Sequence, residues 1–213
     1  MNINEYNEPK NSLVLFELGG KLDFLIQLYK SKQFPKVLMI SGNKGVGKFT
    51  LVNHFLTYTY DQDNYDLENK TINNKTVFYE KYSNNVFPNI IYLSGNKFKN
   101  INVEDIRDLK STIFTTSILD KERFIIFDDI ELFNTNSLNA LLKIIEEPAK
   151  QNYFILINNK TKPMLETIKS RCSEFKIILD SSNRDEIINY LTKNLDSETV
   201  ISKNIIRLTP GNY

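Results

Sequence analysis

Short, continuous apolar runs alternate along this chain with segments in which apolar residues recur at helical spacing. Five runs have the length and composition of buried strands, and they lie at 37–40, 90–93, 124–127, 153–157 and 175–179. Runs without polar alternation are typical of parallel sheets that are covered on both faces. Strands that alternate with helices therefore predict a three-layer α/β/α domain with a doubly wound parallel sheet.

Helical spacing places helices between these strands. The predicted helices lie at about 22–29, at about 48–60, at 103–113 and at 134–147. Asn102 and Asn134 are candidate N-caps of the last two, and Pro148 ends the last one. Residues 61–89 are rich in Asn, Asp, Lys and Tyr without a usable period. We expect them to form a long surface insertion.

Composition narrows the classes of partner that the chain can have. Lys and Arg number 27, and Asp and Glu number 26, so the total charge does not indicate a dedicated nucleic-acid-binding protein. The single cysteine, Cys172, excludes an internal disulfide and a zinc site built from several cysteines. No apolar run reaches transmembrane length, and the N-terminal residues lack the plan of a signal peptide. We therefore expect a cytoplasmic protein without a membrane span or zinc.

The segment between the first strand and the next helix has the layout of a phosphate-binding loop. Its candidate phosphate-binding residues are Gly42, Asn43, Lys44, Gly45, Val46, Gly47, Lys48, Phe49 and Thr50. Glycines allow several backbone N–H groups to point at one anion, the helix N-terminus adds a favourable dipole, and Lys48 adds a positive charge. We therefore expect this loop to bind the phosphates of ATP.

Two departures from the full motif argue against hydrolysis. In active P-loop enzymes a Ser or Thr after the lysine holds magnesium, but here that residue is Phe49. Thr50 lies about 100° further around the helix and cannot simply replace it. The strand at 124–127 delivers Asp128, the candidate magnesium ligand, and then Asp129 in the place of a water-polarising Glu. The shorter side chain misplaces the carboxylate, and a displacement of about 1 Å can lower a rate about 100-fold.

Two further segments resemble motifs of a known family. Residues 136–148 resemble the "NALLK-LEEP" segment of clamp-loader AAA+ subunits, and residues 170–172 (Ser-Arg-Cys) resemble their "SRC" motif. Together with the phosphate-binding loop and the acidic strand, these motifs keep the family's order and spacing over about residues 12–213. The resemblance implies a P-loop AAA+ domain at 1–180, followed by the start of a helical lid domain at 181–213.

The resemblance also implies a function. Clamp-loader subunits assemble into a hetero-oligomeric pentamer that uses ATP to open a sliding clamp and to close it on primed DNA. In that family Arg171 would be a finger that acts on the nucleotide of a neighbouring subunit. Asn159, just after the fourth predicted strand, matches the first sensor of the γ-phosphate.

Departures from the family pattern indicate which kind of subunit this is. Phe49 and Asp129 both differ from the motor subunits, so the chain is most similar to the non-motor subunit, with ATP and magnesium bound weakly or not hydrolysed. Many members carry four zinc-binding cysteines after the phosphate-binding loop, and residues 61–89 contain none. The family's C-terminal collar domain is absent, so we interpret the chain as truncated.

Two other classes of function compete with this interpretation. One is a competent ATPase, either a motor subunit of the same loader or a related branch-migration helicase, which Phe49 and Asp129 argue against. The other is a small-molecule kinase or a dinucleotide-binding protein that uses the glycine loop. A dinucleotide fold needs G-x-G-x-x-G, and residues 45–50 lack the last glycine.

Overall fold

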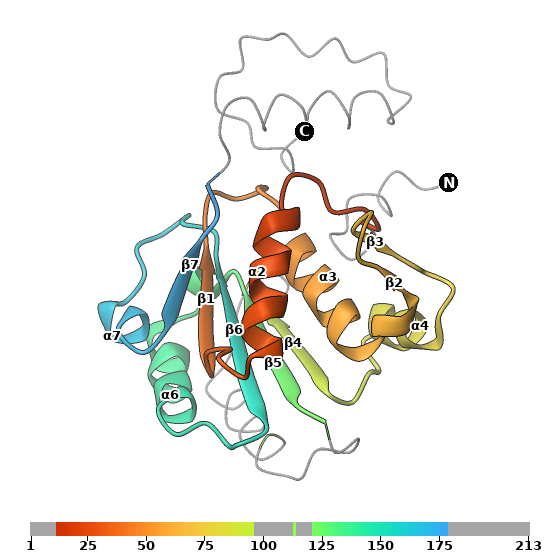
Figure 1. Cartoon of the computed structure of the whole chain (residues 1–213). Helices are drawn as coiled ribbons and strands as arrows, with labels where there is room; N and C mark the ends of the chain where they lie inside the picture. The colour runs from red at the N-terminus through yellow and green to blue at the C-terminus, as the bar shows by residue number, and fades with distance from the viewer. Residues whose placement is uncertain (1–11, 96–112, 114–120, 179–213) are drawn as a thin grey trace, which may run out of the picture.

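The computed structural model describes residues 12–95, 113 and 121–178, and its centre is a five-stranded parallel sheet (Figure 1). The strands are β1 (Val37–Ser41), β4 (Ile90–Ser94), β5 (Arg123–Asp128), β6 (Asn152–Asn158) and β7 (Ser173–Lys176). They lie in the order β4-β5-β6-β1-β7, and each neighbouring pair is parallel. The first strand of this sheet therefore lies between two strands from much later in the chain. This is a doubly wound parallel α/β fold with the glycine loop after its first sheet strand, as the sequence predicts.

Side chains of the central strands alternate between two hydrophobic clusters, one on each face of the sheet. In β5, Phe124 and Ile126 belong to one cluster. Ile125 and Phe127 belong to the other. None of these four residues exposes more than 1% of its surface. Both faces of the sheet are therefore covered, which explains why the strands show no polar alternation.

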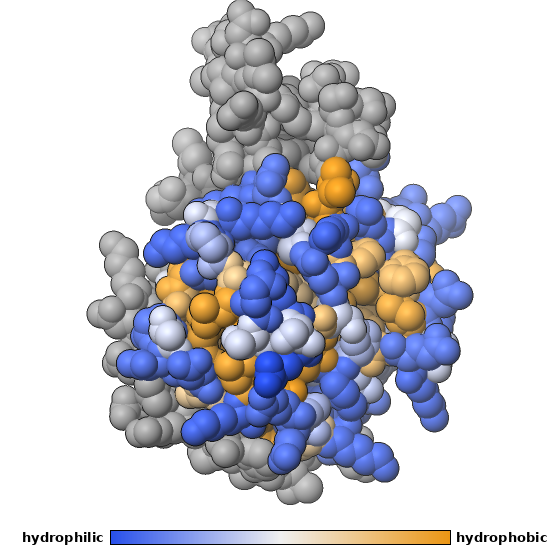
Figure 2. All heavy atoms as spheres, turned by 90° about the vertical axis from the view of Figure 1, so that its left-hand side faces the viewer, coloured by the Kyte–Doolittle hydropathy of each residue, from blue (hydrophilic) through white to orange (hydrophobic). Residues whose placement is uncertain are grey.

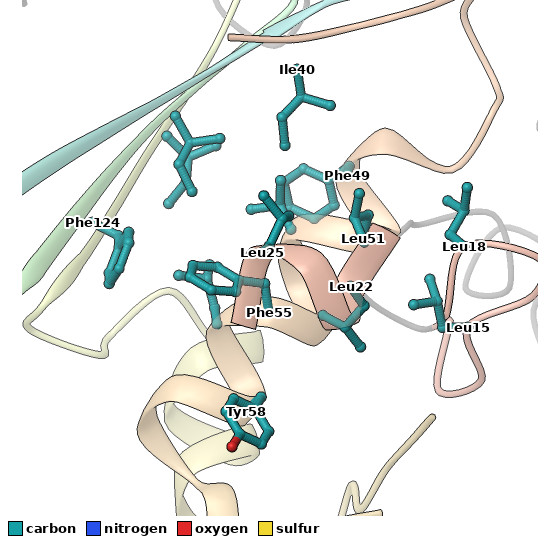
Figure 3. Packing of buried hydrophobic residues seen from close by; sticks show 14 of the residues in the cluster. Leu15, Leu18, Leu22, Leu25, Ile40, Phe49, Leu51, Phe55, Tyr58 and Phe124 are labelled. Carbon is teal, nitrogen blue, oxygen red and sulfur yellow. The ribbon is translucent and has the colours of Figure 1, made fainter. Parts of the chain in front are cut away.

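Helices cover the two faces. They are α2 (Gly19–Lys30), α3 (Lys48–Tyr60), α4 (Val77–Ser83), α6 (Thr135–Ile145) and α7 (Glu166–Lys169), with the 3-10 turns η2 (Gln62–Asn64) and η3 (Ile130–Leu132). Figure 1 shows α2 and α3 on one face, and α6 and α7 on the other. Figure 3 shows Leu22, Leu25 and Phe55 in the core between α2, α3 and the sheet. Asn134 accepts a hydrogen bond from the Ser137 N–H at 2.8 Å, which confirms the predicted N-cap of α6.

Residues 61–89 contradict the prediction of a surface insertion, because they form elements that pack against the core. They contain η2, the hairpin of β2 (Tyr65–Asp66) and β3 (Thr71–Ile72), and α4. Their buried hydrophobic side chains are Tyr65, Ile72, Phe78 and Tyr82. An isolated bridge between Val14 and Thr71 joins the hairpin to the N-terminal segment. These contacts link distant parts of the chain, so a search for local periodicity does not detect them.

His54, on α3, lies buried where the hairpin and the N-terminal segment meet. Its Nε2 lies 3.1 Å from the Ser12 carbonyl oxygen, and its Nδ1 lies 2.9 Å from the Tyr65 hydroxyl. Because a carbonyl oxygen only accepts, Nε2 carries the proton and Nδ1 accepts from Tyr65. Burial lowers the pKa of His54 to about 4. The neutral ring therefore ties three segments together.

Strand β7 is shifted from its predicted position. The apolar run predicts a strand at 175–179, whereas β7 spans Ser173–Lys176. Among the described strands its neighbour is β1, so it forms an edge of the sheet. Ser173 and Glu174 are exposed there, and an edge strand accepts such polar residues. This side of the molecule, which includes α7, faces the viewer in Figure 2, where hydrophilic residues surround smaller hydrophobic areas.

Some predictions fall on other parts of the chain. The predicted helix at 103–113, apart from Ile113, and the predicted lid domain at 181–213 lie outside the described residues. Within the part that the structure describes, no helix is both long and apolar enough to cross a membrane.

Candidate nucleotide-binding site

The predicted site residues meet at one end of the sheet. The loop at 42–47 follows β1, Asp128 and Asp129 follow the apolar part of β5, and Asn159 follows β6. Strand β6 pairs with both β1 and β5, so the three loops are neighbours at the carboxyl ends of their strands. Ligands of open α/β sheets bind at this edge.

The loop at 42–47 has the tight path that a phosphate cradle requires. Gly47, the N-cap of α3, has a φ of 83°, a left-handed conformation that glycine adopts without strain. A Cβ on Gly42 would lie 2.6 Å from the Ile177 carbonyl oxygen, so this position allows no side chain. Within the loop, Asn43 and Lys44 are exposed, while Val46 is buried in the core. The loop is therefore anchored at both ends.

Lys48 carries its positive charge beneath this loop. Its side-chain ammonium donates hydrogen bonds to the carbonyl oxygens of Gly42, at 2.9 Å, and Asn43, at 2.6 Å. Burial lowers the pKa of Lys48 to about 8, and the negative charge of Asp128 opposes that effect. The ammonium and the loop N–H groups are the donors that a phosphate group needs, so this part of the site fits a phosphate.

Phe49 does not replace the missing hydroxyl but belongs to the core. It exposes 8% of its surface and lies among the buried side chains in Figure 3. Its ring meets the ring of Tyr92, on β4, edge to face with centroids 5.2 Å apart. Thr50 is half-buried one residue further along α3. The residue that supplies a magnesium ligand in active P-loop enzymes is therefore replaced here by an aromatic side chain of the core.

Asp128, the predicted magnesium ligand, has a hydrogen bond on each of its oxygens. The Tyr92 hydroxyl donates to Oδ2 at 2.9 Å, and the Asp129 N–H donates to Oδ1 at 2.9 Å. Burial and the charge of Asp129 together raise the pKa of Asp128 to about 6. With no hydroxyl after Lys48 and with this carboxylate engaged, the residues present do not fit a magnesium ion. Among the described residues, no group of three or more His, Cys, Asp or Glu side chains could hold a metal ion.

Asp129 and Asn159 come together as the sequence suggests, and a third residue, Glu131, holds the backbone of Asn159. Asp129 has a φ of 49°, a left-handed conformation that Asp tolerates better than most residues. The Asn159 side-chain amide donates to Asp129 Oδ1 at 2.7 Å, and the Asn159 N–H donates to Glu131 Oε2 at 3.1 Å. The hydroxyl of Thr161 donates to Glu131 Oε1 at 2.7 Å. The Asp129 carboxylate is therefore engaged within the protein.

Glu131 and Tyr92 were not found from the sequence. Glu131 is buried and joins the loop after β5 to the loop after β6, while Tyr92 joins β4 to Asp128. Neither belongs to a recognisable motif, because each role depends on a partner that is distant in the sequence. An acidic residue two positions after Asp129 was the only local signal for Glu131.

Arg171 lies apart from these loops, just after α7. Its guanidinium contacts Glu146 Oε1 through Nε, at 2.7 Å, and through Nη2, at 2.6 Å. Its Nη1 donates to the Thr167 carbonyl oxygen at 2.9 Å. The side chain is 37% exposed. Cys172, beside it, donates from its thiol to the Ile168 carbonyl oxygen, and burial raises its pKa to about 12, so it is not an activated nucleophile.

Comparisons with known proteins identify the family of this chain. A family model described as "DNA polymerase III, delta subunit" matches residues 20–180. The DNA polymerase III subunit delta' of Buchnera aphidicola subsp. Baizongia pistaciae is 36% identical over 80 residues, which cover 38% of this chain and 24% of that protein. The subunit delta' of Buchnera aphidicola subsp. Schizaphis graminum is 25% identical over 188 residues, which cover 86% of this chain and 55% of that protein.

Among solved structures, a DNA polymerase III gamma subunit-related protein from Thermotoga maritima has a TM-score of 0.49 and 20% sequence identity. The match covers 80% of this chain and 52% of that one. The chain thus spans from about a quarter to about half of the length of these relatives. The family model itself covers well over half of this chain. The chain therefore belongs to the DNA polymerase III delta subunit family.

Proposed function

We propose that this chain is part of a delta-prime-like subunit of a bacterial clamp loader, within a cytoplasmic DNA polymerase III holoenzyme. It joins other loader subunits in a hetero-oligomeric pentamer that places a sliding clamp on primed DNA. Within that assembly it is a stator, a subunit that supports the motor subunits and does not hydrolyse ATP itself. Its membership of the family and the chemistry of its phosphate-binding loop support this proposal.

The observation that carries the proposal is the burial of Phe49 directly after Lys48. A motor subunit needs a hydroxyl at this position and a free carboxylate opposite it. Here Phe49 packs on Tyr92, whose hydroxyl donates a hydrogen bond to the Asp128 carboxylate. The loop and Lys48 nevertheless keep the donors for a phosphate group. Nucleotide binding that is weak and does not lead to turnover is therefore the expected behaviour.

The second part of the proposal is that Arg171 acts on the nucleotide of a neighbouring subunit. Phosphoryl transfer spreads negative charge over the γ-phosphate oxygens, and a planar guanidinium stabilises that charge. Arg171 lies between α7 and β7 in the chain and is half-exposed, and its hydrogen bonds go to Glu146, Thr167 and Ser170. Its present partner, Glu146, is also half-exposed, so a neighbour's nucleotide could replace it.

Two measurements on the full-length protein test this proposal. The isolated protein should hydrolyse ATP far below the rate of about 1 per second or more that is typical of enzymes, with a motor subunit as positive control. A loader assembled without this protein should lose clamp loading on primed DNA. Turnover of several ATP per second by the isolated protein would support the motor alternative. If the loader without this protein still loads clamps fully, this protein is not an essential loader subunit.

A further inference from the structure

The aromatic pair of Phe49 and Tyr92 joins the phosphate-binding helix to the acidic strand. Phe49 lies in the first turn of α3, Tyr92 lies on β4, and the two rings meet edge to face. β4 pairs with β5 in a register that sets Ser94 opposite Asp128. The pair therefore connects the first turn of α3, which begins at Lys48, to the strand beside Asp128.

Tyr92 also controls the carboxylate chemically. Its hydroxyl donates to Asp128 Oδ2 and has a further hydrogen bond with Ser94. The other oxygen of Asp128 accepts from the Asp129 N–H. A metal ion bound to Asp128 Oδ2 would compete with the half-buried Tyr92 phenol for that oxygen. A hydrogen bond to a charged carboxylate is stronger than one between neutral groups, so losing it is unfavourable.

We propose that the phosphate-binding loop of this protein takes a nucleotide without magnesium, because Phe49 and Tyr92 close the position of the metal. The ligand class is the metal-free nucleoside polyphosphate, bound by the loop N–H groups and by lysine charge. This inference rests on one part of the proposed function, namely that the loop at 42–47 binds a nucleotide. It goes beyond that proposal because it concerns the ionic form of the ligand.

Two lysines supply positive charge at the loop. Lys48 lies beneath the loop with its ammonium on the loop carbonyl oxygens. Lys160 follows Asn159, and it is close enough for its charge to act on Lys48. It is exposed, and its backbone is held by an N–H bond to the Asn158 side chain. A metal-free triphosphate is more negative than its magnesium complex, so both lysines attract it more strongly.

The first experiment measures the affinity of the full-length protein for ATP by calorimetry, in magnesium and in EDTA. The affinity in EDTA should equal or exceed the affinity in magnesium. Binding that is about tenfold tighter in magnesium would overturn this inference but not the proposal of a stator subunit. No binding in either buffer would overturn the inference together with the claim that the loop holds a nucleotide, and it would leave the loader tests unaffected.

Variants test whether the aromatic pair is the cause. The double variant Phe49→Thr, Tyr92→Phe restores a hydroxyl and frees Asp128, so ATP binding should become about tenfold tighter in magnesium than in EDTA. Tyr92→Phe alone keeps the ring packing and serves if the double variant does not fold. It should shift the ratio of the two affinities about threefold towards magnesium. A folded variant with an unchanged ratio would refute the role of the pair.

Matched controls exist in the same chain. Tyr29 donates to Glu122 Oε2 at 3.0 Å, so Tyr29→Phe removes another phenol–carboxylate bond from the opposite end of the sheet. It should leave the magnesium ratio unchanged, and a shift equal to that of Tyr92→Phe would overturn the assignment. Lys160→Ala should weaken ATP binding in EDTA about threefold, whereas Lys162→Ala, on the same loop, should not. If the two substitutions weaken ATP binding equally, Lys160 does not contact the nucleotide.

Discussion

Replacing Phe49 by Thr is the perturbation that tests most directly whether this position belongs to the core. The substitution restores the residue type that active P-loop enzymes carry after the lysine. In this chain it removes a ring that is 92% buried, since only 8% of Phe49 is exposed. It also removes the edge-to-face contact with Tyr92, whose centroid lies 5.2 Å away. The change should therefore lower stability even though it improves the motif.

The structure sets the size of the loss. Truncation of a buried Phe to Ala lowers the free energy of unfolding by about 3–5 kcal/mol. An aromatic pair adds about 0.5–1.5 kcal/mol beyond its buried area. Thr fills part of the space but brings a hydroxyl into apolar surroundings, so we expect a loss of about 2–4 kcal/mol. That is a large fraction of the about 5–15 kcal/mol by which domains are stable.

Urea unfolding followed by circular dichroism measures this loss. The matched control is Phe24→Thr, because Phe24, on α2, is 47% exposed and stacks on Phe175. It should lose less than half as much stability as Phe49→Thr. If the two variants lose equal amounts, or if Phe49→Thr loses less than about 1 kcal/mol, the ring does not close the site as described.

Three further predictions concern other residues of the fold and the site. Lys48→Ala should abolish ATP binding, because the phosphate loses its main charge partner, while Lys75→Ala, an exposed lysine outside the loop, should retain it; equal losses would contradict the assignment. His54 should destabilise the protein by about 2 kcal/mol between pH 7 and pH 5. Its pKa of about 4 in the folded state lies below the ordinary 6.5, so the unfolded chain takes up the proton first as the pH is lowered. The free energy of unfolding therefore decreases as the pH decreases. The raised pKa of Asp128 has the opposite effect on stability, so the contribution of His54 is isolated by comparing His54→Gln with the wild type. Urea unfolding at pH 7 and pH 5 should show a smaller loss of stability in the variant, and equal losses would refute the prediction. Glu146→Ala should change the free energy of unfolding by less than about 1 kcal/mol, because its ion pair is half-exposed, and a larger loss would make the pair structural.

The parts of the fold that followed from the sequence are those in which burial is decided locally. The apolar runs of β1, β5 and β6 predict buried parallel strands, because both faces of such strands need apolar side chains. The Asn134 cap and the glycine loop have short-range signatures as well. In each case the residues that form the element also carry the signal for it.

The parts that did not follow depend on distant partners. Tyr65 is buried against His54 and Tyr58 of α3, and no pattern within residues 61–89 indicates those contacts. β7 begins at Ser173, a polar residue, because its place is set by pairing with β1. Likewise, the roles of Tyr92 and Glu131 in the site arise from contacts across strands. The sequence therefore indicated the motif of the site but not the residues that close it.

The most direct test of the proposed function is the ATP hydrolysis of a clamp loader assembled with the full-length protein carrying Arg171→Ala. Fingers that act on a neighbouring subunit contribute roughly 10³–10⁵ in rate, so DNA- and clamp-stimulated hydrolysis should fall by about tenfold or more. Arg171→Lys should recover little, because an ammonium lacks the planar fork. Lys169→Ala, which breaks a nearby exposed ion pair with Glu166, is the matched control and should have no effect. Unchanged stimulated hydrolysis in an intact Arg171→Ala complex would contradict the account and leave Arg171 as a surface partner of Glu146.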